Sequence, residues 1–141
     1  MPYATVDDLK ALIGERELIQ LTDRSTPPAD AIDLDVANGA LQAASDTVDS
    51  YVAAAYALPL ASTPSMLKDL AVDLARHRLY AGKASEEVQA RYDEAMKRLR
   101  DISSGKAKIP GAEGQDPPAR AGMVLSASSE RLFSRDNLRR Y

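Results

Sequence analysis

The segment that most constrains the fold is TPSMLKDLAVDLARHRLYAG, residues 63–82, which is apolar around most of a helical circumference. Projected at about 100° per residue, it carries apolar side chains on one side and on a second flank: Leu67, Leu70, Ala71, Leu74 and Ala75, then Val72 and Leu79. The polar side chains share a narrow strip, which consists of Asp69, Asp73, Arg76 and Tyr80. Since such a helix is normally buried between others, we predict that it is the central helix of a small helical domain.

Composition favours helices and divides the chain into an acidic body and a basic tail. The chain has six Tyr, one Phe and no Trp but many Ala and Leu residues, which favours helices over a sheet sandwich. Residues 1–104 hold 11 basic and 17 acidic side chains, a net charge of −6, whereas residues 105–141 hold 7 and 4, a net charge of +3. We predict an all-α fold, with a bundle of four to five helices over residues 1–104 and an extended C-terminal docking arm over residues 105–141.

The composition also excludes several classes of function. There is no cysteine, which excludes a disulfide framework and a cysteine-based metal site and fits a reducing compartment. No run approaches the ~18 apolar residues of a membrane span, and the first residues lack the order of a signal peptide. We therefore expect synthesis in the cytosol and no membrane partner. The acidic body lacks the basic surface that grips nucleic acid through its phosphates.

A short helix, a second short turn and one long helix are predicted before the central one. Thr5 and Asp8 form a variant capping box at the start of a helix over residues 6–13, and the second short turn follows in GERELIQLTDR. Ser25–Ala31 contains two prolines and is predicted to be a loop. Asp33–Tyr56 is predicted to be a long amphipathic helix, whose acidic outer face carries Asp35, Gln42, Asp46 and Asp49.

The central and last helices have recognisable ends. Thr63 is the predicted N-cap of the central helix, with Pro64 at its first position, and Ser85 is the predicted N-cap of the last helix. The last helix carries a single apolar stripe, which consists of Val88, Tyr92, Ala95, Met96, Leu99 and Ile102. Three acid-first i,i+4 pairs support it, namely Glu87/Arg91, Asp93/Lys97 and Glu94/Arg98. Gly105 is predicted to cap its end.

The chain changes character after Lys106. IPGAEGQDPPARAG is rich in Gly and Pro and has almost no apolar residue, so it cannot pack a core by itself. MVLSAS has the composition of a short strand, and SERLFSRDNLRRY ends the chain with apolar residues amid charges. Two interpretations stay open, a frayed terminus and an arm that orders on a partner through its apolar residues.

No catalytic constellation is recognisable in the sequence. The single histidine, His77, has no second His or Cys to join it, and we interpret it as a packing residue rather than a catalyst or ligand. Asp69 and Asp73 are four residues apart, but a solvated acidic strip explains them better than a metal site. Phosphate-binding glycine loops are missing. We therefore predict neither enzymatic activity nor a cofactor nor a metal.

Arg78 is the unusual charge of the central helix, because the projection places it near the middle of the apolar arc, beside Leu74 and Ala75. A guanidinium at that position is a candidate for a buried ion pair, within the domain or across a subunit contact, since leaving it unpaired costs several kcal/mol. The alternative is a long side chain that reaches the surface with its charged end.

Five stretches of the chain together resemble one protein family. In chain order they are TVDDLKALIGERELIQLTDR, YALPL, LAVDLARHRLY, RYDEAMKRLRDISSGK and LFSRDNLRRY. Their combination is similar to the Mu-like bacteriophage neck proteins, a group of head-completion or head-to-tail adaptor proteins. The similarity spans most of the chain and keeps the motif order, missing only Ser25–Ala31 and Ile109–Arg120.

The resemblance implies a structural virion protein without enzymatic activity, located at the neck between head and tail. Such adaptors form a homo-oligomeric ring, commonly of twelve copies, that binds the portal and a downstream neck or tail-completion protein. The ring extends the channel through which genomic DNA passes without sequence-specific binding. The family pattern implies a partner-docking role for six residues of the C-terminal segment: Leu132, Phe133, Arg135, Asp136, Leu138 and Tyr141.

Two further interpretations follow from charge. The acidic residues Asp35, Asp46 and Asp49 are candidates for the channel lining, because like charges repel DNA, although an outward solvated face is the competing explanation. From another class of function, a small DNA-binding helical regulator would use the C-terminal cations on phosphates: Arg131, Arg135, Arg139 and Arg140. The acidic body and the absence of a clear recognition helix weigh against that alternative.

Overall fold

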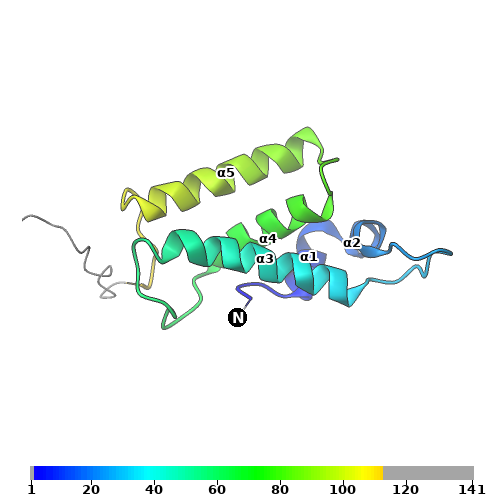
Figure 1. The fold of residues 1–141 in the computed structure, drawn as a ribbon, viewed down its shortest axis with the longest axis horizontal. Coiled ribbons are helices and arrows are strands. Elements are labelled where there is room, and N and C mark those ends of the chain that lie inside the picture. The colour runs from blue at the N-terminus through cyan, green and yellow to red at the C-terminus, as the bar shows by residue number, and fades with distance from the viewer. Residues whose placement is uncertain (1, 113–141) are drawn as a thin grey trace, which may run out of the picture.

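A computed structural model describes residues 2–112, and over this range the chain is entirely helical (Figure 1). The helices of this range are α1 (Val6–Ile13), α2 (Glu15–Thr22), α3 (Leu34–Val52), α4 (Ser65–Leu79) and α5 (Glu86–Ser103). The predicted all-α fold is confirmed for this part of the chain, while the predicted strand in MVLSAS lies outside the described residues. None of these helices combines the length and the hydropathy that crossing a membrane requires.

Helix α4 is the centre of the bundle, as predicted. It packs against α3 on one side and α5 on the other, and it also contacts α1; Figure 1 shows it between the two longer helices, with α1 and α2 gathered at one end. Seven of its side chains are 5% exposed or less, and they include both predicted flanks: Leu67, Leu70, Ala71, Val72, Leu74, Ala75 and Leu79. Burial of this kind stabilises the fold by roughly 1.5–3 kcal/mol for each large aliphatic side chain.

The N-terminal helices form as their local signals predict. Thr5 and Asp8 complete the capping box, since the Thr5 amide donates to Asp8 Oδ2 at 2.8 Å and the Asp8 amide donates to Thr5 Oγ1 at 3.3 Å. Gly14 separates α1 from α2 with φ +83°, a conformation that side chains other than glycine rarely adopt. The chain can therefore reverse direction between two short helices that pack against each other.

Two predicted helix boundaries are wrong by a few residues. Helix α3 ends at Val52 rather than at Tyr56, and the chain turns over residues 53–56. Helix α4 has Pro64 as its N-cap and starts at Ser65, while Thr63 is exposed and caps nothing. Proline fits this position because its fixed φ suits extended backbone and it has no amide to satisfy. Leu34, the first residue of α3, is 57% exposed because it stands at the free first turn.

The packing of the domain continues beyond the predicted boundary at residue 104. Ile109 is 1% exposed and Ala112 is 7% exposed, and both belong to the same core as α3, α4 and α5. The Ile109 amide also donates to the Tyr56 hydroxyl at 3.0 Å. Residues 105–112 are therefore part of the helical domain rather than the start of an arm, because one large apolar side chain is enough to hold this segment on the bundle.

Candidate functional site

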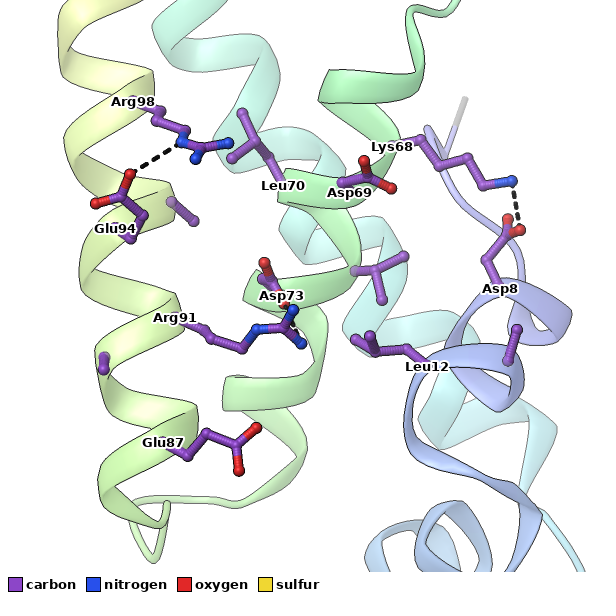
Figure 2. A pocket seen from close by; sticks show the side chains of 14 residues that line it. Asp8, Leu12, Lys68, Asp69, Leu70, Asp73, Glu87, Arg91, Glu94 and Arg98 are labelled. Atoms are coloured by element: carbon purple, nitrogen blue, oxygen red, sulfur yellow. Dashed lines mark hydrogen bonds and ion pairs between the residues drawn. The ribbon is translucent and has the colours of Figure 1, made fainter.

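A groove of about 840 Å³ runs along α4 between α1 and α5, and it is a candidate binding surface for a partner. Figure 2 shows α5 on one side of the groove, α1 on the other and α4 along its base. Its deepest side chains are apolar, with Leu70, Val72 and Ala95 each 5% exposed or less. Leu12 stands at the α1 edge and is 41% exposed, and Ala11 and Ala90 are exposed beside the groove as well. The walls of the groove therefore offer apolar surface to an occupant.

Charged side chains form the rim of the groove, and several are paired across it. Lys68 Nζ lies 2.5 Å from Asp8 Oδ1, which ties α4 to α1, and Arg91 Nη1 lies 3.6 Å from Asp73 Oδ1, which ties α5 to α4 (Figure 2). On α5 itself, Arg98 Nε lies 3.1 Å from Glu94 Oε1. Of the three predicted i,i+4 pairs, only this last one forms an ion pair among the described residues.

Two carboxylates of the rim take no part in these pairs. Asp69 is exposed and has no ion-pair partner within residues 2–112, and Glu87, which is 75% exposed, forms a long ion pair with Arg76 Nη1 at 3.8 Å. They lie toward opposite ends of the groove in Figure 2. The lining as a whole holds five carboxylates and three cationic side chains, a net charge of −2. The groove is therefore suited to an occupant with apolar residues and an excess of positive charge.

The carboxyls of the two ion pairs that join α4 to α1 and α5 have pKa values shifted in opposite directions. The hydrogen bond from Lys68 lowers the pKa of the Asp8 carboxyl, with the Thr5 amide adding to the effect. Burial raises the pKa of the Asp73 carboxyl, and the charge of Arg91 opposes that shift without cancelling it. Ionising Asp73 therefore costs more free energy in the folded protein than in water, and a further cation beside it would lower that cost.

The buried ion pair of α4 forms at Arg76, and its prediction at Arg78 within the domain is wrong. Arg78 is exposed, whereas the Arg76 side chain is 12% exposed and its Nη2 donates to Glu17 Oε1 at 3.1 Å. The Tyr80 hydroxyl donates to the same carboxylate oxygen at 2.5 Å. These hydrogen bonds, Tyr80's first, lower the pKa of Glu17. The projection missed this because the partner, Glu17, belongs to α2, and no pattern within α4 reveals that contact.

The three acidic residues of α3 do not share one environment. Asp35 and Asp46 are exposed, and Asp46 accepts a hydrogen bond from Gln42 Nε2 at 2.8 Å. Asp49 is half-buried and accepts a short hydrogen bond from the Tyr3 hydroxyl. Burial, with the Asp49 hydrogen bond second, raises the pKa of that hydroxyl. Asp49 therefore has a structural role in holding the N-terminus on α3, and the exposed acidic face reduces to Asp35 and Asp46.

His77 packs as predicted. Its ring stacks on Tyr92 of α5 with centroids 4.0 Å apart and planes 21° apart, and its Nε2 lies 3.0 Å from Gln89 Oε1. Within residues 2–112 no group of three or more His, Cys, Asp or Glu side chains is arranged to hold a metal ion. Asp73, one half of the acidic pair weighed for metal binding, is instead engaged with Arg91.

Two buried hydroxyls form hydrogen bonds that no sequence pattern predicts. Thr22 and Ser45 are fully buried. Thr22 Oγ1 accepts the Asp33 amide at 3.1 Å, and Ser45 Oγ accepts the Tyr3 amide at 3.0 Å. Each hydroxyl joins the start of a segment to a distant helix, so only the tertiary arrangement identifies it. The six predicted partner-docking residues lie outside the described residues: Leu132, Phe133, Arg135, Asp136, Leu138 and Tyr141.

The described residues define the class of protein as a compact five-helix bundle with a charged-rimmed groove and an acidic helix face. The profile of the family described as Bacteriophage Mu, Gp36 matches residues 3–127, so the chain belongs to this family. It is 34% identical over 137 residues to "Gene product J" of Escherichia phage Mu, with 96% of each chain covered. It is also 32% identical over 83 residues to "Mu-like prophage FluMu protein gp36" of Haemophilus influenzae, with 59% of each covered. The predicted relationship to Mu-like phage proteins is confirmed.

Proposed function

We propose that this chain is a structural virion protein, a head-to-tail adaptor that forms a ring beneath the portal at the phage neck. The observation that carries the proposal is the match to the phage Mu Gp36 family, which extends over residues 3–127 and is collinear with nearly the whole of the Mu relative. Four of the five stretches that resemble the Mu-like neck proteins lie within that match, and LFSRDNLRRY lies beyond it. The adaptor acts by binding, without catalysis or a cofactor, and it is located in the virion at the head-tail junction.

The bundle suits a ring subunit on physical grounds. A closed ring needs a heterologous interface, in which one surface of a subunit meets a different surface of the next. This chain offers one candidate for such a surface in the groove between α1 and α5, and its basic C-terminal segment is the candidate for the complementary one. The proposed partners are further copies of the chain in a closed ring, commonly of twelve copies in the neck proteins that the chain resembles, together with the portal and the next neck or tail-completion protein.

The acidic face of α3 supports a proposal for the channel. Asp35 and Asp46 point to solvent on a face whose other exposed residues are small or neutral, among them Asn38, Gly39 and Gln42. Negative charge at a channel wall repels the DNA backbone and lets the genome slide without sticking. We propose that this face, rather than the groove, borders the DNA channel of the ring.

The proposal is tested by removing the chain from the phage that encodes it. The expected result is an accumulation of separate DNA-filled heads and complete tails, because the joint between them is missing. Purified chain added to a mixture of such heads and tails is expected to restore infectious particles. Normal particle yield without the chain would overturn the adaptor role.

The same experiment separates the adaptor from the DNA-binding regulator. A regulator would bind duplex DNA as an isolated protein, with an affinity that falls steeply as salt rises. Its loss would change the amounts of other phage proteins rather than the joining of finished heads and tails. The groove with its net charge of −2 and the acidic face of α3 favour the adaptor over this alternative.

A further inference from the structure

We propose that the groove between α1, α4 and α5 receives the C-terminal segment, residues 128–141, of a neighbouring copy of this chain. The inference deepens the proposed function, on which it rests, by assigning the contact that closes the ring. It starts from the groove, whose apolar base and acidic rim have no occupant among residues 2–112.

The segment 128–141 has the chemistry that the groove selects. It holds four arginines and two carboxylates, a net charge of +2, against the net charge of −2 of the groove lining. It also holds Leu132, Phe133 and Leu138, and Phe133 is the only phenylalanine of the chain. Apolar anchors in a pocket with cations at its rim are the usual composition of a binding hot spot. The arginines would meet Asp69, which has no ion-pair partner among residues 2–112, and the exposed Glu87, whose ion pair with Arg76 is long at 3.8 Å.

The length of chain beyond residue 112 permits the contact. Residue 112 is buried on the bundle, and residues 113–130 provide 18 residues before the first anchors. An extended chain of that length reaches at most about 60 Å, whereas a small helical domain is roughly 30 Å across. The segment can therefore reach the groove of an adjacent subunit. A contact of this kind, from the arm of one copy to the groove of the next, is heterologous and closes a ring when it is repeated.

Disulfide trapping tests the contact, because the chain has no natural cysteine. Ala90 is exposed and lines the groove, so the variant Ala90→Cys/Ser134→Cys places one thiol at the groove and one in the segment. The full-length variant is assembled into virions and oxidised. We expect chains joined into dimers, trimers and larger species, which dissociate when reduced. The matched control is Ser50→Cys/Ser134→Cys, since Ser50 is exposed on α3 outside the groove, and it should give at least tenfold less of these species.

Charge reversal tests the recognition itself. Asp69→Lys/Glu87→Lys, added to the disulfide-trapping variant and compared with it at equal amounts of assembled chain, should lower the yield of linked chains at least tenfold. Asp93→Lys is the control for surface charge, because Asp93 is exposed on α5 outside the groove. Reversing the charge of the C-terminal segment as well, by adding Arg131→Glu/Arg139→Glu to the Asp69→Lys/Glu87→Lys variant, should restore the yield of linked chains. Thermal unfolding followed by circular dichroism checks that each variant is folded.

Each other outcome overturns the inference. A link within a single chain would place the segment in its own groove, and a link from Ser134→Cys to a larger virion protein would place it on the portal. If the chain is present in the virion neck and Ala90→Cys/Ser134→Cys gives no interchain link, the groove contact is wrong while the adaptor role stands. If normal virions form without the chain, the adaptor role itself fails.

Discussion

At the scale of single residues, the polar contacts that matter most join helices that are distant in sequence. Glu17 of α2 accepts hydrogen bonds from both Arg76 and Tyr80 of α4, and 59 residues separate Glu17 from Arg76. An arginine side chain that is 12% exposed needs a charged partner, because an uncompensated guanidinium at this depth is costly. The contact thus fixes how the N-terminal helices sit on the central one.

Glu17→Gln should lower the free energy of unfolding by about 1–2 kcal/mol at neutral pH, a value between those of exposed and buried pairs. The folded state lowers the pKa of Glu17, so its contribution is present above the carboxyl's unfolded pKa and is lost as pH falls through the folded value. The difference between variant and wild type should therefore shrink below about pH 4. Urea unfolding at several pH values measures it. Glu15→Gln, which alters the exposed pair with Lys10, is the control and should change little.

Thr22→Val should cost about 1–2 kcal/mol of stability, because it keeps the shape of the side chain but removes the acceptor of the Asp33 amide. Thr47→Val is the matched control. Its hydroxyl donates only to Ala43 O within the same helix, so its loss should cost less. Equal midpoints for the two variants in urea unfolding would contradict the role assigned to Thr22.

At the scale of elements, the ends of the helical domain are decided by single packed side chains. Residues 105–112 contain little apolar surface, yet Ile109 and Ala112 lie in the core and Tyr56 accepts the Ile109 amide. The turn after α3 places the Tyr56 hydroxyl 3.0 Å from that amide. A segment that composition alone assigns to an arm is therefore held on the bundle.

Ile109→Ala should destabilise the domain by about 2–4 kcal/mol, the usual cost of removing a buried isoleucine side chain. Lys108→Ala is its control, because Lys108 is exposed. A chain that ends at residue 104 should likewise unfold at lower urea concentration than a chain that ends at residue 112. If both shortened chains unfold at the same midpoint, residues 105–112 do not belong to the domain.

At the scale of the whole molecule, charge is distributed unevenly over the surfaces that a ring would use. The groove lining carries a net charge of −2, and the exposed face of α3 carries Asp35 and Asp46 without a cation. The C-terminal segment carries the opposite sign. In the proposed ring, this arrangement would let one acidic surface bind a neighbour while the other repels DNA.

Asp35→Lys/Asp46→Lys should slow genome ejection by about tenfold, since lysines repeated around a ring would bind phosphates of the passing DNA. The rate of DNA release from purified virions measures it, at two salt concentrations because the effect should weaken as salt rises. Asp7→Lys/Asp93→Lys is the control, with the same charge change at exposed positions of α1 and α5. Unchanged ejection and genome retention would leave the face of α3 as ordinary solvated surface.

The sequence by itself determined the helices, because their signals are local. The apolar circumference of α4, the capping box at Thr5 and Asp8, and the stripe of α5 each lie within one short segment, and all are confirmed. Only the tertiary structure decided the partner of Arg76, the place of Ile109 and the groove. Each of these depends on which helices meet, and that choice follows from the packing of the whole core rather than from any periodicity along the chain.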